Sequence, residues 1–201
     1  PDVVGMAVTG SFAAGNADEL SDVDLRVYAR SGAVETVVAR GLVPFVDIAY
    51  QGFGEGIDAD GEVVRRFARA GGPVFVSNSF SKSFSLYGER VGALSVVAGS
   101  SEEAARVLSQ LKRTVRTNYS NPPTHGSQIV ATVLTTPDLR ALWETELGQM
   151  RERIRGTRRQ LVEKLRVRAP RADFGFVMRQ RGMFSYSGLS KSQVARLREE
   201  F

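Results

Sequence analysis

A lysine stands among small hydroxyl residues in the segment 79–86, which reads Ser-Phe-Ser-Lys-Ser-Phe-Ser-Leu. This lysine, Lys82, follows an apolar run at 73–76 that predicts a strand, and Arg90 comes after the segment. A lysine amine can form a Schiff base with an aldehyde, while hydroxyls and a guanidinium hold a phosphate. The segment therefore fits a pyridoxal phosphate site. The alternative is a surface lysine in a serine-rich loop, because short motifs give many false matches.

A second segment, 41–53, places a carboxylate where such a site needs one. Asp47 closes an apolar run, which predicts a buried parallel strand with an acid at its carboxyl end. A carboxylate there keeps the pyridine nitrogen of the cofactor protonated, so that the ring acts as an electron sink. Tyr50 follows and can hydrogen-bond the ring hydroxyl. The two segments together favour the cofactor site over a plain surface loop.

From about residue 38 to 201 the sequence resembles the aspartate and aromatic amino acid aminotransferases, which are class I enzymes of fold type I. The resemblance rests on ordered blocks at 46–53, 79–84, 86–92, 119–126 and 182–189. It implies an α/β fold that contains part of the large-domain sheet and the start of the small α+β domain. It also implies transfer of an amino group between an aspartate or aromatic amino acid and a 2-oxo acid.

The resemblance assigns a role to each matching residue around the cofactor, pyridoxal 5'-phosphate. Lys82 is implied to be the Schiff-base lysine and the proton carrier. Asp47 is implied to pair the pyridine nitrogen and Tyr50 to contact the ring oxygen. Ser79 and Arg90 are implied to bind the phosphate.

Two further residues are implied to act across a subunit boundary. Arg116 matches the arginine that receives the side chain of a dicarboxylate substrate in the neighbouring subunit's site. Ser120 matches a phosphate contact that also crosses the dimer. The resemblance therefore implies a homodimer whose small-molecule partners are amino acids and 2-oxo acids.

The family's enzymes are longer than this chain, and several of their cofactor and substrate contacts have no counterpart in it. These include the aromatic residue that stacks on the ring and the arginine that holds the substrate's α-carboxylate. We therefore expect weak cofactor binding and reduced or absent activity, since poor orientation of a substrate raises the barrier. A non-catalytic fusion remnant is the corresponding alternative.

The first residues, about 3–30, resemble a different family, the polymerase-β-like nucleotidyltransferases. Gly10 and Ser11 can cradle triphosphate oxygens. Asp22 and Asp24 are two apart, so on a strand both carboxylates point to one face and can hold Mg²⁺. The alternative is a polar turn followed by an ordinary strand. No third carboxylate of the family pattern is visible in the sequence.

The chain therefore reads as a composite with a seam near 29–40. We expect a nucleotidyltransferase-like fragment over 1–37, part of the aminotransferase large domain over 38–136, and a long helix with the start of the small domain over 137–201. Hydrophobic spacing and turn residues predict the elements. Strands are expected at 3–8, 22–28, 42–48, 74–77, 93–98 and 174–179. Helices are expected at 61–70, 102–117, 126–134, 138–166 and 191–200.

Composition indicates a folded, cytoplasmic chain without metal-binding thiolates. The 201 residues are 42% hydrophobic and 24% charged, which argues against disorder. No apolar run reaches membrane-spanning length. Cysteine is absent, and the single histidine, His125, makes a histidine zinc site implausible.

The net charge of +5 and pI of about 9.9 come largely from basic residues of the expected helix 138–166. Its apolar residues recur at helical spacing, so most of the arginines should fall on the opposite face. A solvated face is favoured over a nucleic-acid surface, because no aromatic residues alternate with the arginines to stack on bases.

Overall fold

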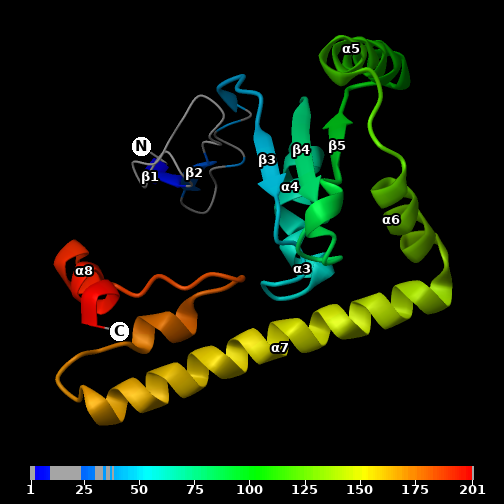
Figure 1. Ribbon diagram of the computed structural model, residues 1–201. Helices are drawn as coiled ribbons and strands as arrows, with labels where there is room; N and C mark the ends of the chain where they lie inside the picture. Colours follow the sequence, from blue (N-terminus) through cyan, green and yellow to red (C-terminus); the bar gives the residue numbers. More distant parts are fainter. Residues whose placement is uncertain (1–2, 10–23, 30–33, 35–36, 38, 201) are drawn as a thin grey trace. The chain divides into compact units, whose positions relative to one another are not determined.

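The structure is a computed structural model that describes residues 3–9, 24–29, 34, 37 and 39–200 (Figure 1). Its contacts divide the chain into two compact units. Unit 1 takes in 1–46, 63–76 and 94–120, and unit 2 takes in 47–62, 77–93 and 121–201. This division by contacts differs in kind from the three segments expected along the sequence, and those segments stay a prediction.

Two strands near the start of the chain pair with each other. β1 (Val3–Thr9) and β2 (Asp24–Ala29) are antiparallel, with Thr9 opposite Asp24 and an irregularity between Val3 and Gly5. The strands expected at 3–8 and 22–28 are confirmed over the residues that the structure describes.

A three-stranded sheet contains β3 (Phe45–Ile48), β4 (Val74–Ser79) and β5 (Gly92–Val97) in that order. The chain between β3 and β4 forms α3 (Ile57–Asp60) and α4 (Glu62–Ala70), a helical connection that is typical of parallel neighbours. The backbone amide of Phe75 donates to the backbone carbonyl of Pro44. The side-chain amide of Asn78 donates to the side-chain oxygen of Gln51. Since both contacts advance in the same direction along the chain, β3 and β4 run parallel.

The expectation of a buried β3 is wrong for half of its residues. Exposed and half-buried side chains alternate along the strand, and the Phe45 side chain is 67% exposed. Asp47 lies on the exposed face. By contrast, Val74 and Val76 of β4 are buried, as a central strand requires.

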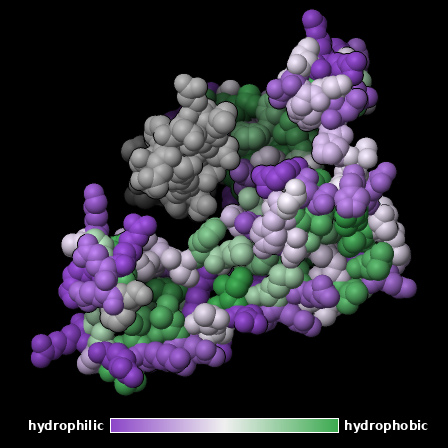
Figure 2. All heavy atoms as spheres, viewed as in Figure 1, coloured by the Kyte–Doolittle hydropathy of each residue, from purple (hydrophilic) through white to green (hydrophobic). Residues whose placement is uncertain are grey.

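All five expected helices are present, with boundaries within a few residues of the prediction. They are α4, α5 (Ser101–Tyr119), α6 (His125–Thr135), α7 (Pro137–Arg168) and α8 (Lys191–Glu200). A short 3₁₀ turn, η1 (Tyr87–Glu89), and α3 were not expected. The visible face of α5 is mostly hydrophilic (Figure 2), in keeping with a helix that has no buried residue.

Polar side chains define several helix starts. Ser190 and Gln193 bond each other's backbone amides, which is a complete capping box for α8. At α5 the Ser100 hydroxyl accepts from the Glu103 amide, while the Glu103 carboxylate accepts from Gly99. Thr136 precedes Pro137 at the start of α7, but its side chain makes no capping bond.

The strand expected at 174–179 is wrong, because this segment forms a 3₁₀ helix, η2 (Gly175–Arg179). The Asp173 carboxylate accepts from the Gly175 amide at 2.7 Å and starts the turn. The amides of Val177 and Gln180 then bond the carbonyls three residues before them. Only Val177 of the segment is buried, so that the alternation that a strand needs is absent.

The core of unit 2 forms where α7 contacts α6 and η2. Its buried apolar side chains are Phe53, Val130, Leu147, Val162 and Val177. A Cβ built on Gly52 would lie 2.4 Å from Leu147 Cδ2, and Gly52 has a φ of 94°. A side chain at this position therefore has neither the space nor the backbone conformation it requires. Within the described residues, no helix is long and apolar enough to cross a membrane.

Candidate functional site

Lys82 lies in a tight turn that directly follows β4. The Phe80 amide donates to the Val91 carbonyl, and the Ser85 amide donates to the Lys82 carbonyl. The Ser79 hydroxyl accepts from the Ser81 amide at 3.3 Å. Ser81 is buried and Lys82 half-buried. These backbone hydrogen bonds fix the conformation of the turn. They therefore also fix the direction in which the Lys82 side chain leaves the backbone.

An aromatic ring from the residues after the turn contacts the amine of Lys82. Lys82 Nζ lies 4.6 Å from the centroid of the Tyr87 ring, a cation–π contact. Arg90 Nη1 donates to the Tyr87 carbonyl at 3.1 Å. Arg90 has a φ of 50°, in the left-handed region where a residue with a side chain is uncommon. Arg90 is exposed, and its remaining guanidinium donors are free to bind an anion.

An aromatic pair braces the turn, formed by Trp143 of α7 and Phe84 of the turn itself. The Trp143 indole donates to the Ser83 carbonyl at 2.7 Å. Its ring stacks on Phe84, with centroids 4.5 Å apart and planes 20° apart. Ser83 is buried and lies next to Lys82 in the chain. The long helix therefore helps to position the lysine, a role that the sequence did not reveal.

The loop after β3 comes close to the end of β4 through Gln51. Its side chain accepts from Asn78 and donates to the Ile57 carbonyl at 2.9 Å. Because β3 and β4 are parallel neighbours, Asp47 and Lys82 lie at corresponding ends of adjacent strands. Tyr50 is half-buried and packs edge-on against Phe184, with centroids 5.3 Å apart.

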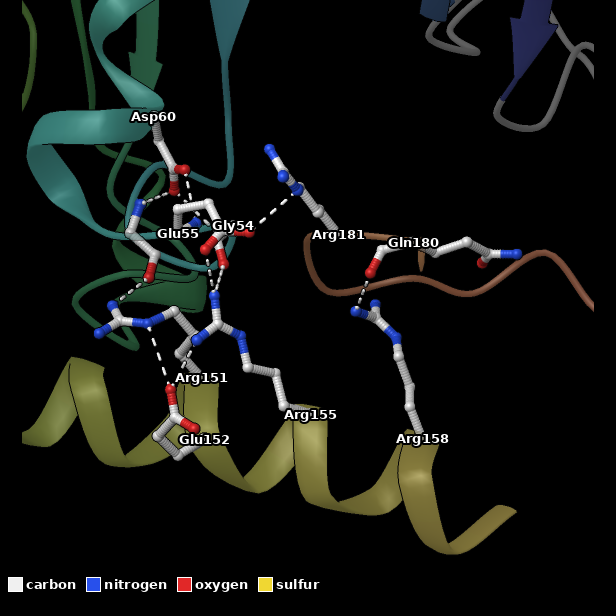
Figure 3. A network of polar contacts seen from close by, with 10 residues as sticks. Gly54, Glu55, Asp60, Arg151, Glu152, Arg155, Arg158, Gln180 and Arg181 are labelled. Atoms are coloured by element: carbon white, nitrogen blue, oxygen red, sulfur yellow. Dashed lines mark hydrogen bonds and ion pairs between the residues drawn. The ribbon is translucent and has the colours of Figure 1, made fainter. Parts of the chain in front are cut away.

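A single carboxylate holds this loop. Asp60 accepts from the backbone amides of Gly52, Gly54 and Glu55 at 2.8, 2.9 and 2.8 Å (Figure 3). A Cβ on Gly54 would lie 2.4 Å from Asp60 Oδ1, so the close approach requires glycine. This role of Asp60 could not be predicted from the sequence, since its partners are backbone groups that any residue carries.

The unengaged groups of this site match the chemistry of pyridoxal phosphate. Among the described residues, the Lys82 amine and the Asp47 carboxylate have no hydrogen-bond or ion-pair partner, so both are available to a ligand. The hydroxyl of Ser79 and the guanidinium of Arg90 supply phosphate donors in the same unit. The residues present therefore fit the cofactor.

Arg116 and Ser120 belong to unit 1, at the end of α5. Arg116 Nη1 donates to the Ser120 hydroxyl at 2.7 Å, and both residues are exposed. Ser120 has a φ of 73°. The structure brings these two predicted residues together, and their roles across a dimer stay predictions.

Arg158 of α7 is a residue whose importance the sequence did not indicate. Its guanidinium donates to Ser185 Oγ at 2.7 Å and to the carbonyls of Gln180, Gly182 and Phe184. The side chain is buried, with 7% of the residue exposed. Burial, together with the nearby charge of Arg155, lowers the pKa of Arg158.

The expected solvated face of α7 is therefore only partly correct. Arg153, Arg159, Arg166 and Arg168 are exposed as expected. Arg151 and Arg155 are half-buried, and each donates to a loop carbonyl, that of Gly52 or Gly54, at 2.9 Å. These carbonyls carry no side-chain signature, so the sequence could not identify them as partners.

Gly10, Ser11 and Asp22 of the expected magnesium site lie outside the described residues, and Asp24 is described only as the first residue of β2. Among the described residues, no group of three or more histidines and acids is placed to hold a metal ion. The comparisons below give no support to a nucleotidyltransferase segment, and we propose no magnesium-dependent function for it.

The chain belongs to the aminotransferase class I and II family, whose profile matches residues 32–201. It is 61% identical to an aspartate aminotransferase of Pseudomonas aeruginosa over 179 residues, which are 89% of this chain and 45% of that protein. It is 56% identical to an aromatic-amino-acid aminotransferase of Escherichia coli over 84% of this chain and 42% of that protein.

Solved structures of aminotransferases also match this chain. An aromatic-amino-acid aminotransferase from Burkholderia pseudomallei, covalently bound to pyridoxal phosphate, matches with a TM-score of 0.82 and 67% identity over 84% of this chain and 42% of that chain. One from Psychrobacter sp. B6, cocrystallised with aspartic acid, matches with a TM-score of 0.81 and 46% identity over 84% of this chain and 42% of that chain. The chain thus spans less than half the length of these relatives. The fold, a partial fold type I aminotransferase, is as expected.

Proposed function

We propose that this chain takes part in pyridoxal phosphate-dependent transfer of an amino group between an aspartate or aromatic amino acid and a 2-oxo acid. The observation that carries the proposal is Lys82, a half-buried residue whose amine has no hydrogen-bond or ion-pair partner in the described part of the chain. Membership of the family and the relative that is covalently bound to pyridoxal phosphate support the choice of cofactor.

Pyridoxal phosphate, when bound, supplies an aldehyde that reacts with amines and a ring that withdraws electrons. In this proposal Lys82 provides the amine that anchors the group and later moves a proton at Nζ. Asp47 holds positive charge at the ring nitrogen, because a carboxylate favours a proton on a neighbouring base. Tyr50 donates a hydrogen bond to the ring oxygen.

The phosphate would be held by Ser79 and Arg90. Arg90 is exposed and presents planar N–H donors that match phosphate oxygens. Trp143 and Phe84 keep the turn between these two residues in one conformation. Binding to a fixed turn avoids the entropy of ordering it when the ligand arrives.

The substrate and the oligomeric state belong to the same proposal. Arg116 would receive the side-chain carboxylate of a dicarboxylate substrate in the site of a second subunit, and Ser120 would contact that subunit's phosphate group. The 2.7 Å contact between the two residues supports their acting as one surface. A homodimer follows from this arrangement, and light scattering of the purified chain measures it.

Covalent capture of the cofactor tests the proposal. The chain is incubated with pyridoxal phosphate, reduced with borohydride, digested and mapped by mass spectrometry. We expect the added group on Lys82, and its loss in Lys82→Ala. Lys164→Ala is the matched control, because Lys164 is exposed on α7.

Labelling that is spread equally over all lysines, or that persists unchanged in Lys82→Ala, would contradict the assignment of Lys82. A separate measurement addresses amino transfer, in which aspartate or phenylalanine is added to the loaded chain and the absorbance of the cofactor is followed. Conversion of the cofactor in the native chain but not in Lys82→Ala supports the activity.

A further inference from the structure

Arginines gather around a cavity that lies apart from the proposed cofactor site. The cavity has a volume of about 530 Å³ and lies in unit 2, between α7, the end of η2 with the residues after it, and the loop after β3. Its charged lining residues are Glu55, Arg155, Arg158, Arg159, Arg179 and Arg181. None of Asp47, Ser79, Lys82 and Arg90 lines it.

Glu55 is the one carboxylate that lines this cavity among the described residues, and it is already paired. Glu55 Oε2 lies 2.7 Å from Arg155 Nη2, and Glu55 Oε1 lies 2.9 Å from Arg181 Nε (Figure 3). Arg155 also pairs with Glu152 at 2.9 Å. These ion pairs neutralise part of the charge, and they fix two guanidinium groups at the wall of the cavity.

Arg158 is occupied as well, since its donors reach Ser185 and three backbone carbonyls. Its burial and the nearby charge of Arg155 lower its pKa. Because like charges repel, an anion close to these two arginines would offset part of the repulsion.

Two other arginines, Arg159 and Arg179, also line the cavity. Within the residues that the structure describes, neither has a hydrogen-bond or ion-pair partner. Each offers planar N–H donors that match the oxygens of a phosphate or carboxylate group in pairs. One comes from α7 and the other from η2, so an anion between them would bridge two elements.

We propose that this arginine-lined cavity binds a small oxyanion of two or more negative charges, such as a compound with a phosphate group or several carboxylates. The cavity volume lies in the range of small-molecule sites, about 300–1,000 Å³. The guanidinium groups of Arg159 and Arg179 bind the anion directly. Arg155 and Arg181, which are held by ion pairs, add positive electrostatic potential. The site is separate from the proposed cofactor site and does not depend on the proposed function.

Calorimetric titration at constant ionic strength tests the proposal, with inorganic pyrophosphate and citrate as probes. We expect saturable binding of at least one probe to the native chain. Arg159→Gln/Arg179→Gln should weaken it by about a hundredfold, because each of the two lost charge-assisted pairs is worth about 1.4 kcal/mol, or about tenfold. Arg153→Gln/Arg166→Gln removes the same charge from exposed positions outside the cavity and should bind as the native chain does.

The two probes separate the sources of the shared chemistry: preference for pyrophosphate indicates a phosphorylated ligand, and preference for citrate a polycarboxylate. Arg90→Gln shows whether the probe binds at the proposed cofactor site, because Arg90 belongs to that site and does not line the cavity. Binding that is lost in Arg90→Gln but kept in Arg159→Gln/Arg179→Gln would place the probe in the proposed cofactor site and overturn the proposal. Equal losses in the cavity variant and its control, or no saturable binding to the native chain, would overturn it too.

Discussion

The indole of Trp143 donates to the main-chain carbonyl of Ser83 over 2.7 Å, and Ser83 is the residue after Lys82. A helix that is distant in sequence thereby fixes the backbone beside the proposed reactive lysine. Ser83 is buried, so its carbonyl has little access to water as a substitute partner. The position of Lys82 thus depends on a contact that its own segment does not make.

Trp143→Phe tests this relationship. Phenylalanine retains an aromatic ring to pack on Phe84 but has no N–H, so we expect the free energy of unfolding to fall by about 1–2 kcal/mol. Cofactor affinity should also fall, because the turn is less well fixed. Circular dichroism in urea is the appropriate measurement, since Trp143 is the sole tryptophan and the variant lacks tryptophan fluorescence.

Leu142→Phe is a suitable control, because Leu142 is an exposed neighbour on α7. It should leave both the unfolding free energy and the yield of cofactor labelling near their native values. A Trp143→Phe variant of native stability that labels as fully as the native chain would show that the indole contact does not position the turn.

A second prediction concerns the loop after β3. Asp60→Ala removes the acceptor for three backbone amides, those of Gly52, Gly54 and Glu55. We expect a loss of about 1–3 kcal/mol in the free energy of unfolding, since the part-buried hydrogen bonds of Gly52 and Gly54 lose their acceptor. Hydrogen exchange of these amides should accelerate.

Glu146→Ala is the comparison for this experiment, because Glu146 is exposed on α7. It should change neither the stability nor the exchange rates of the loop. If the three amides exchange at native rates in Asp60→Ala, the carboxylate is not what holds the loop.

The sequence predicted the elements around Lys82 because local signals agreed there. An apolar run, a hydroxyl-rich turn and helix caps act between residues close in the chain, as the capping box of Ser190 and Gln193 does. These signals, together with the family resemblance, identify the candidate site residues, which are Lys82, Asp47, Ser79 and Arg90.

Contacts with backbone groups were not predictable in the same way. The carbonyls that Arg158 binds, and the amides that Asp60 binds, can belong to any residue type. The segment 174–179 was expected to be a strand from its apolar content, yet the Asp173 carboxylate starts a 3₁₀ turn there. The partners of Arg158 are distant in sequence and leave no local pattern, whereas at 174–179 a local turn at Asp173 outweighed the strand pattern.

A third prediction concerns Arg158. Arg158→Lys keeps the charge but replaces a planar fork of donors with a single ammonium, so it cannot reach Ser185 and all three carbonyls together. We expect the free energy of unfolding to fall by at least about 2 kcal/mol, because buried acceptors lose their partners. Arg166→Lys, at an exposed position on the same helix, should be neutral. Equal midpoints of urea unfolding for the two variants would contradict this account of Arg158.

The last prediction addresses Asp47 in the proposed cofactor site. Asp47→Asn preserves shape but removes the negative charge that would favour a protonated ring nitrogen. We expect cofactor affinity to fall by about tenfold, the equivalent of about 1.4 kcal/mol. The unfolding free energy should be unchanged, because Asp47 is exposed and no described residue bonds its carboxylate.

The combination of weaker cofactor binding and native stability distinguishes a ligand-binding role for Asp47 from a structural one. Glu163→Gln, at an exposed position on α7, makes the same change of charge and should keep native affinity. Titration with pyridoxal phosphate, followed by cofactor absorbance, gives the affinities, and urea unfolding gives the stabilities. A drop in stability without a change in affinity would assign Asp47 to the fold and remove it from the site.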